Sequence, residues 1–426
     1  MSISRRQLLG SAAVLAGTVA LGGAAVADRR PTASATPALP APGTSGIDHI
    51  VVVMMENRSF DHFLGWVPGA DGKQAGLTYV DRSGIPRGTH HLTEYASCGH
   101  HDPDHSSEAG RIQLAAGRVD GWLKAGEDDL LPIGYYEQAD LGFFGQAAPQ
   151  WTVCDRSFSA VMAETYPNRL YLHCAQTDRI HNSTTTATMP TIWDRLATAS
   201  VSGRYYFSDV PFLGLWGTTY LPISHPYAAF LADAAAGQLP AVSFIDPRFM
   251  DEASGTSSDD HPHADIRAGE AFLNEVYRAV TTGPGWERTM LVITYDEWGG
   301  FYDHVAPTTA PDTSPTTALR GFRVPTMVVS PRARRGHVAH ATYDHTSILK
   351  AIEWRWGLPA LSPRDAAARN IAEVLDFSAP ANLAAPAYVT PPFAATVCSP
   401  EAVSGPEEPE WSDLKDKAHA AGWSLP

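Results

Sequence analysis

Long uninterrupted apolar runs are the clearest pattern along this chain. Residues 50–55 read Ile-Val-Val-Val-Met-Met, and residues 290–295 read Met-Leu-Val-Ile-Thr-Tyr. Continuous β-branched and apolar runs of this length are typical of strands buried on both faces, as in parallel sheets. Similar runs and helical spacing predict further strands at 241–245 and 324–330 and helices at 265–280 and 346–356. Strands that alternate with helices predict a three-layer α/β/α sandwich with a mainly parallel central sheet.

Each of the two long strands is followed directly by acidic and amide residues. Glu56 and Asn57 follow the first strand, and Asp296 and Glu297 follow the second. Ligands bind at the carboxyl ends of strands in open α/β sheets, so we expect these four side chains to converge. Crowded carboxylates repel one another unless a cation neutralises them. An all-oxygen set suits Mg²⁺, Ca²⁺ or Mn²⁺ best and also admits Zn²⁺. Taken alone, Glu56 is also consistent with a simple strand cap.

A third segment, Thr165-Tyr166-Pro167-Asn168-Arg169, predicts the start of a helix. Proline is favoured at the first helical position, so we expect the helix to begin at Pro167 and Thr165 to precede it. The N-terminus of a helix carries unpaired N–H groups and partial positive charge, which attract anions. Thr165 is therefore either a helix cap or a nucleophile that the helix end and a metal activate. Arg169 is expected to bind a phosphoryl oxygen or to form a surface ion pair.

Five motifs occur in order between residue 47 and about residue 357. They are Glu-Asn-Arg-Ser-Phe-Asp-His at 56–62, His-Asp-Pro-x-His at 101–105, Thr-x-Pro-Asn-Arg at 165–169, Asp-His-Pro at 260–262, and Tyr-Asp-Glu-x-Gly-Gly-Phe-Tyr-Asp-His at 295–304. Together they resemble the bacterial phosphoesterase family of phospholipases C and related acid phosphatases, in the alkaline phosphatase superfamily. Each motif alone is weak evidence, whereas five in the same order are specific.

The resemblance implies an alkaline-phosphatase-like fold and a role for each matching residue. Thr165 matches the Ser or Thr nucleophile of the family, which also contacts the metal. Metal ligands of the family match the strand-end residues Glu56, Asn57, Asp296 and Glu297. The active-site histidines of the family, which would contact the phosphoryl group or protonate the leaving alcohol, match His101, His261 and His304. The neighbouring His105 and His263 are not separable from these histidines by sequence.

The resemblance also implies a reaction, the hydrolysis of phosphoric esters with a divalent ion (Ca²⁺, Mn²⁺, Mg²⁺ or Zn²⁺). The expected activity is that of a phospholipase C on phosphatidylcholine-type lipids, through a phosphothreonine at Thr165. A broad-specificity acid phosphatase on the same site is the alternative. A non-catalytic secreted binding protein is disfavoured, because it has no use for a nucleophile. Glu164 stands where the family often has Gly or Ser, which adds a carboxylate beside Thr165.

The charge of the chain narrows its partners. The sequence has 31 Lys and Arg against 46 Asp and Glu, a formal net charge of −15. This balance disfavours nucleic acids, whose phosphates need basic patches, and electrostatic binding to anionic lipids. We therefore expect the substrate to be a zwitterionic phospholipid or a small soluble phosphoester.

The N-terminal residues predict export. Ser-Arg-Arg-Gln-Leu-Leu at 4–9 has the twin-arginine pattern, and an apolar stretch follows it. Ala25-Val26-Ala27 has the small residues of a signal-peptide cleavage site. Residues 1–27 are therefore expected to engage the twin-arginine (Tat) translocon. The mature protein would be extracellular or cell-wall associated and would have no stable membrane anchor, the alternative being an uncleaved anchoring helix.

The rest of the chain suggests a simple domain organisation. Residues 28–46 are rich in Pro, Ala, Thr and Ser and predict a disordered linker. Residues 47–426 are expected to form a single phosphoesterase domain, with a Pro- and Ala-rich extension from about residue 377 that ends in a helix at 411–421. Three disulfide pairings are open to the four cysteines Cys98, Cys154, Cys174 and Cys398.

Overall fold

A computed structural model of the protein describes residues 38–399 and 407–426. The predicted signal at 1–27 and most of the predicted linker at 28–46 lie outside the described residues. Within the described part, a short 3-10 helix at Pro42–Thr44 leads into the fold, and Ser45 is already buried. No helix of this part is both long and apolar enough to cross a membrane.

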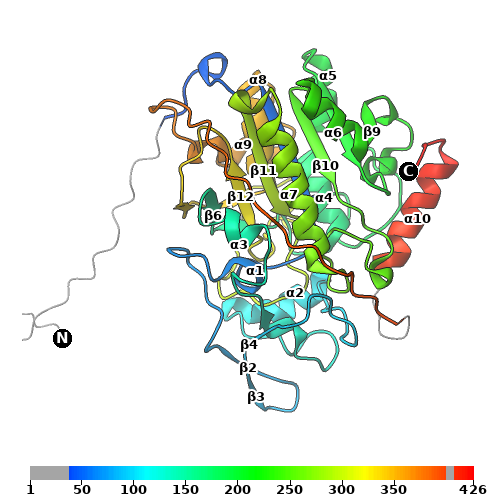
Figure 1. Ribbon diagram of the computed structural model, residues 1–426. Coiled ribbons are helices and arrows are strands. Elements are labelled where there is room, and N and C mark those ends of the chain that lie inside the picture. Colours follow the sequence, from blue (N-terminus) through cyan, green and yellow to red (C-terminus); the bar gives the residue numbers. More distant parts are fainter. Residues whose placement is uncertain (1–37, 400–406) are drawn as a thin grey trace, which may run out of the picture. The chain divides into compact units, whose positions relative to one another are not determined.

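An eight-stranded sheet with the order β13-β6-β12-β11-β1-β10-β8-β9 forms the centre of the fold (Figure 1). The buried strand β1 (His49–Met55) lies between β10 (Val242–Asp246) and β11 (Thr289–Tyr295) and runs parallel to both. The remaining strands of this sheet are β6 (Thr152–Cys154), β8 (Gly203–Phe207), β9 (Ser224–Pro226), β12 (Thr326–Val329) and β13 (His337–Ala339). In this sheet only β12 is antiparallel to its neighbours.

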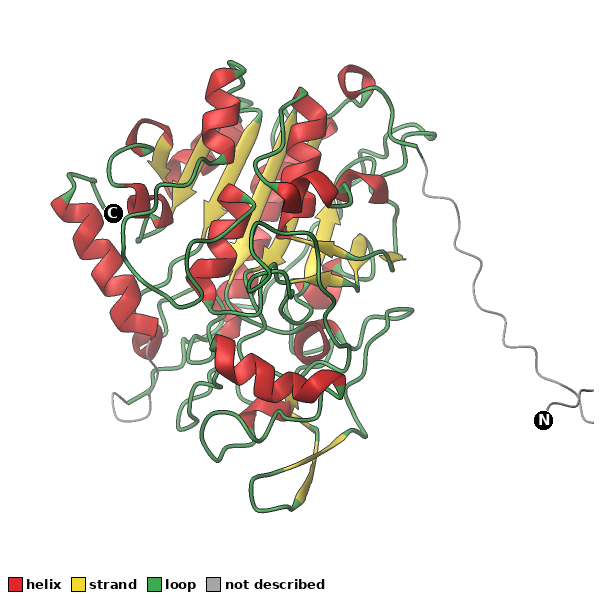
Figure 2. Ribbon diagram, turned by 180° about the vertical axis from the view of Figure 1, so that it is seen from behind, coloured by secondary structure: helices red, strands yellow, loops and turns green. Residues whose placement is uncertain are grey.

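Helices cover both faces of the sheet, as Figures 1 and 2 show. On one face, α7 (Ile266–Thr282) packs against α6 (Tyr227–Ala236) and β11. On the other face, α4 (Thr165–Cys174) packs against α5 (Ile192–Thr198) and α8 (His345–Trp356). Because each helix buries an apolar stripe against the sheet, the two layers enclose one continuous core. This arrangement confirms the predicted three-layer α/β/α sandwich with a mainly parallel sheet.

Shorter elements surround this frame. The short helices are α1 (Phe60–Leu64), α2 (Ser107–Leu114), α3 (Phe144–Ala147) and α9 (Pro363–Ala367), and a longer one, α10 (Glu407–Ala420), lies near the C-terminus. Small two-stranded sheets pair β2 (Thr78–Val80) with β3 (Pro86–Gly88), β4 (His90–His91) with β5 (Gly134–Tyr135), and β7 (Ser157–Phe158) with β14 (Tyr343–Asp344).

One predicted boundary needs correction. Helix α4 begins at Thr165, with Glu164 at its N-cap, and not at Pro167. Pro167 fits in the first turn because the N–H groups of that turn have no partner within the helix. The backbone N–H that proline lacks therefore costs no helical hydrogen bond. Thr165 is therefore the first residue of the helix and does not precede it.

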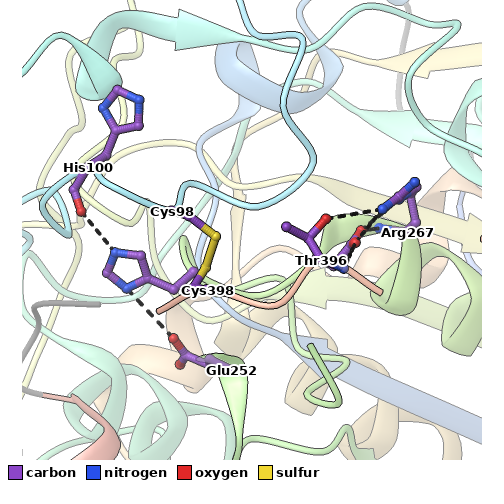
Figure 3. Close-up of a disulfide and its surroundings, with 8 residues drawn as sticks. Cys98, His100, Glu252, Arg267, Thr396 and Cys398 are labelled. Atoms are coloured by element: carbon purple, nitrogen blue, oxygen red, sulfur yellow. Dashed lines mark hydrogen bonds and ion pairs between the residues drawn. A yellow bond between two sulfur atoms is a disulfide. The ribbon is translucent and has the colours of Figure 1, made fainter. Parts of the chain in front are cut away.

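The C-terminal segment runs along α7 and is fastened by side chains and a disulfide. The Tyr277 hydroxyl donates to the carbonyl of Pro386 at 2.8 Å, and Asn274 Nδ2 donates to the carbonyl of Tyr388 at 3.2 Å. Further along, Cys398 forms a disulfide with Cys98, 300 residues away in sequence (Figure 3). The structure therefore pairs Cys98 with Cys398. The other two cysteines, Cys154 and Cys174, are buried free thiols.

Candidate active site

The ends of β1 and β11 bring the four predicted ligands together. The two strands are in register with Met55 opposite Tyr295, so the residues that follow them are also neighbours. The backbone N–H of Asp296 donates to the carbonyl of Met55 at 3.1 Å, which extends this pairing beyond the strands. The four side chains Glu56, Asn57, Asp296 and Glu297 are all fully buried. Burial of so many acids at one point requires compensating positive charge.

Arg169 supplies part of this charge from one turn inside α4. Its Nε donates to Asp296 Oδ2 at 3.0 Å and lies 3.6 Å from Glu56 Oε1, and its Nη1 donates to Asp246 Oδ1 at 3.1 Å. Burial alone lowers the pKa of Arg169, but the charges of Asp296, Asp246 and Glu56 reverse this and raise it. The guanidinium is therefore permanently charged. The surface ion pair expected for Arg169 is corrected, because its carboxylate contacts are buried, whereas its contact with a phosphoryl oxygen stays a prediction.

Asp246 is a site residue that the sequence analysis missed. It is the last residue of β10, beside β1, and its other oxygen accepts a hydrogen bond from the Tyr205 hydroxyl at 2.5 Å. Burial raises the pKa of Asp246, while Arg169 opposes this rise. The signal was available, because Asp246 follows a predicted strand just as Glu56 and Asp296 do.

Replacing Arg169 with methionine is expected to lower the free energy of unfolding by about 3–5 kcal/mol, because it leaves buried carboxylates without their partner. Urea denaturation at neutral pH measures this difference. A matched control is Arg118→Met, which removes a surface pair with Asp120 whose side chains are 65% and 46% exposed. The control should change stability by no more than about 1 kcal/mol. An equally small effect at Arg169 would contradict a buried neutralising role.

Asn57 and Glu297 meet at a glycine. Gly299 has φ +61, and a Cβ there would lie 2.6 Å from Asn57 Oδ1 and 2.0 Å from the Asn57 carbonyl oxygen. Its N–H donates to Glu297 Oε2 at 2.8 Å. Among the described residues, neither amide atom of the Asn57 side chain has a hydrogen-bond partner, although the residue is fully buried. Since buried polar atoms are normally satisfied, Asn57 fits a group that binds from outside the chain.

Thr165 lies at the N-terminus of α4 on the same face as Arg169, because residues four apart share one side of a helix. The side chain is fully buried. Asn168 shapes the turn before it, since its Nδ2 contacts the carbonyls of Val161, Ala163 and Glu164 at 2.8–3.1 Å. The Glu164 carboxylate pairs with His181 Nδ1 at 2.8 Å. The extra carboxylate beside Thr165 thus has a histidine partner.

The structure distinguishes the histidines that the sequence could not. His261 is buried, with Nδ1 2.9 Å from Glu252 Oε1 and Nε2 3.6 Å from Asp102 Oδ2. His105 is also buried, and its Nδ1 lies 4.0 Å from the same Asp102 oxygen. His101, the residue predicted from this motif, is exposed, and its backbone N–H donates to Asp129 at 3.0 Å.

His304 belongs to a different cluster of charged side chains. Its Nδ1 lies 2.5 Å from Asp61 Oδ2, and its Nε2 lies 3.1 Å from Asp71 Oδ1. Arg323 joins this cluster by donating to Asp61 at 3.0 Å and to Asp303 at 2.9 Å. Burial lowers the pKa of His304, but the hydrogen bond and charge of Asp61 outweigh it, so the pKa lies above its usual value. Both ring nitrogens of His304 thus face carboxylates.

Several groups of side chains have the donor chemistry of a metal site. In the described part of the chain, potential ligand atoms lie within 4.8 Å of one another in the groups Asp102–His105–His261, Glu252–His261–His263 and Asp61–Asp303–His304. The strand-end set differs from these groups because it offers only oxygen donors, including the unsatisfied amide of Asn57. This donor set fits a divalent cation.

The motifs and this geometry agree with the comparisons to known proteins. The family model described as "Phosphoesterase family" matches residues 47–222 and 217–359. The chain belongs to the phosphoesterase family. It is therefore a hydrolase that acts on phosphoric ester bonds, which confirms the resemblance seen in the motifs.

Relatives in this family include enzymes from plants and bacteria. The chain is 33% identical to non-specific phospholipase C6 of Arabidopsis thaliana over 379 residues, which cover 78% of this chain and 72% of that protein. It is 30% identical to phospholipase C B of Mycobacterium tuberculosis over 459 residues, with 86% and 85% covered. A solved protein of the alkaline phosphatase superfamily from Vibrio parahaemolyticus matches with 8% identity and a TM-score of 0.37 over 76% of this chain and 70% of its own, too distant to support an argument.

Proposed function

We propose that this phosphoesterase is a phospholipase C that cleaves phosphatidylcholine-type lipids into diacylglycerol and a phosphorylated headgroup. The observation that carries the proposal is the placement of Thr165. It lies at the N-terminus of α4, one turn from Arg169, which itself contacts both Glu56 and Asp296. A hydroxyl at a positive helix end and beside an acidic metal site suits attack on a phosphodiester. The names of the phospholipase C relatives support this substrate class.

The residues proposed to hold a divalent ion are Glu56, Asn57, Thr165, Asp296 and Glu297. When bound, the ion would withdraw charge from the hydroxyl oxygen of Thr165 and from the phosphoryl group. Oxygen donors favour Ca²⁺, Mg²⁺ or Mn²⁺ over Zn²⁺. Arg169 offsets part of the carboxylate repulsion through its contacts with Asp296 and Glu56.

We propose two displacements at phosphorus. Thr165 Oγ releases its proton to solvent and forms a bond to phosphorus while the bond to the diacylglycerol oxygen breaks, and His261 gives its own proton to that leaving oxygen. Water then forms the second bond to phosphorus, the phosphothreonine bond breaks, one proton of the water passes to the Thr165 oxygen, and His261 regains a proton from solvent. The family resemblance gives His101 and His304 contacts with the same groups. The burial of His261 beside two carboxylates supports a proton-transfer role more directly than the surface position of His101.

A side-by-side assay tests the substrate class. The chain from Asp28 onwards is purified and given phosphatidylcholine, sphingomyelin and an aryl phosphomonoester at equal concentrations. Release of diacylglycerol and phosphocholine at a higher kcat/KM than phosphate release from the monoester supports the phospholipase C proposal. The reverse order favours a phosphomonoesterase on the same site. Thr165→Ala protein serves as the control for contaminating activity.

We also propose that the twin-arginine sequence exports the protein to the cell exterior or the cell wall. The proposal rests on Arg5 and Arg6 before an apolar stretch and on the Ala25-Val26-Ala27 cleavage pattern. Changing both arginines to lysine is expected to retain the precursor inside the cell, while secreted wild-type protein should begin at Asp28. Fractionation and N-terminal sequencing measure both. Normal secretion of the double variant would contradict Tat export.

A further inference from the structure

A buried glutamate contacts the proposed proton donor and has no counterpart in the motifs. Glu252 opens a 3-10 helix at Glu252–Ser254, and only 2% of the residue is exposed. Its Oε1 lies 2.9 Å from His261 Nδ1, and its Oε2 lies 3.9 Å from His263 Nδ1. A carboxylate this close to one ring nitrogen of a histidine stabilises the protonated ring, which then has a proton to give.

His263 is held differently from His261. Its Nε2 lies 3.1 Å from the carbonyl oxygen of His100, a contact that Figure 3 shows beside the disulfide. The Nε2 of His261 lies 3.6 Å from Asp102 Oδ2. Of the two histidines, His261 has the shorter contact with Glu252, 2.9 Å against 3.9 Å for His263.

The disulfide-linked C-terminal segment lies directly behind Glu252. The backbone N–H of Cys398 donates to the carbonyl of Ala253, the next residue, at 2.9 Å. Cys398 is also bonded to Cys98 (Figure 3). The N–H of Ser97 donates to the carbonyl of Pro262 at 3.1 Å. Gly255, with φ +70, lets the segment pass so closely that a Cβ there would meet the Thr396 carbonyl at 2.4 Å. These contacts join the loop of Glu252, the loop of His261 and the C-terminal segment.

We propose that Glu252 is a positioning residue for His261 and that the Cys98–Cys398 disulfide holds the C-terminal segment against the loop of Glu252. The inference rests on the proposed function, in which His261 protonates the leaving alcohol. Glu252 itself does not reach the substrate and acts through the ring of His261. The disulfide then links full activity to an oxidising compartment, because reduction frees the segment that supports Glu252.

Leaving-group dependence separates this role from a purely structural one. Diacylglycerol leaves as an alcohol and needs a proton, whereas p-nitrophenol leaves as a stable phenolate. The variant Glu252→Gln keeps the shape of the side chain and removes its charge. It is expected to lower kcat on phosphatidylcholine about 10²-fold, at the low end for lost general-acid catalysis, with little change in KM. Its kcat on p-nitrophenylphosphocholine, which carries the same headgroup, should fall less than about 3-fold.

A matched control lies one residue away. Asp251 has an exposed side chain paired with Arg248 and a left-handed backbone, which asparagine also tolerates. Asp251→Asn should therefore leave both activities unchanged. Equal losses on both esters in Glu252→Gln, or no loss on either, would overturn the positioning role.

The disulfide is tested with the double variant Cys98→Ser/Cys398→Ser in the full chain. It should show the same selective loss on phosphatidylcholine, and adding Glu252→Gln should cost less than the product of the two separate losses. Multiplicative losses, or losses equal on both esters, would overturn the role of the disulfide.

A ¹H–¹⁵N spectrum of His261 reports its tautomer independently of turnover. An unchanged spectrum in Glu252→Gln would refute positioning, whereas wild-type protein inactive on both esters would refute the proposed function instead.

Discussion

Thr165→Ala is expected to lower turnover at least about 10³-fold, equivalent to on the order of 4 kcal/mol of barrier, because it removes the proposed nucleophile. If Thr165 were only a helix cap, its loss would cost about 1 kcal/mol of stability and leave the chemistry intact. The structure weakens that alternative, because the N-cap position belongs to Glu164 and Thr165 is the first residue inside α4. Steady-state kinetics on phosphatidylcholine, together with thermal unfolding, separate the two explanations.

Thr165→Ser is the matched variant, because it keeps the hydroxyl and should retain measurable turnover. The proposed phosphothreonine also has a stereochemical consequence. Two successive displacements at phosphorus restore the original configuration, so a chiral thiophosphate substrate should react with net retention. An Ala variant that is active but less stable, or inversion at phosphorus, would rule out Thr165 as the nucleophile.

Removal of divalent ions with a strong chelator is expected to abolish turnover, and one class of divalent ion should restore it. The reason is the buried set of carboxylates, for which Arg169 provides only part of the compensating charge. Asp296→Asn should raise the ion concentration needed for half-maximal activity or eliminate activity, because an amide replaces an anionic ligand. The amide oxygen can still accept the hydrogen bond from Arg169, so the fold should persist.

A surface carboxylate provides the control for the metal prediction. Asp128 is exposed, and Asp128→Asn makes the same chemical change at the surface, so the ion requirement should not move. Elemental analysis of purified protein, paired with activity, measures occupancy. Full turnover by protein that contains no bound metal would contradict the proposed role of the strand-end residues.

The sequence by itself determined the frame of this protein and the centre of its site. The apolar runs at 50–55 and 290–295 are short and rich in β-branched residues, which favours strands buried on both faces over buried helices. Once both strands lie parallel and in register, with Met55 opposite Tyr295, the residues that follow them leave the sheet at the same edge. The motif around Thr165 indicated a helix start for a local reason, although the helix begins at Thr165, two residues before the predicted Pro167.

Only the tertiary structure decided which polar side chains face one another across loops. The carboxylate partners of Arg169 and the Cys98–Cys398 pairing join residues tens to hundreds of positions apart. The contact between Glu252 and His261 and the different burial of His101 and His105 also depend on how the loops fold. Loops have no periodicity that fixes where a side chain points, and a histidine or a carboxylate reads the same in sequence whether it is buried or exposed. Packing of the loops onto the sheet settles those directions, because each buried charge must find its partner there.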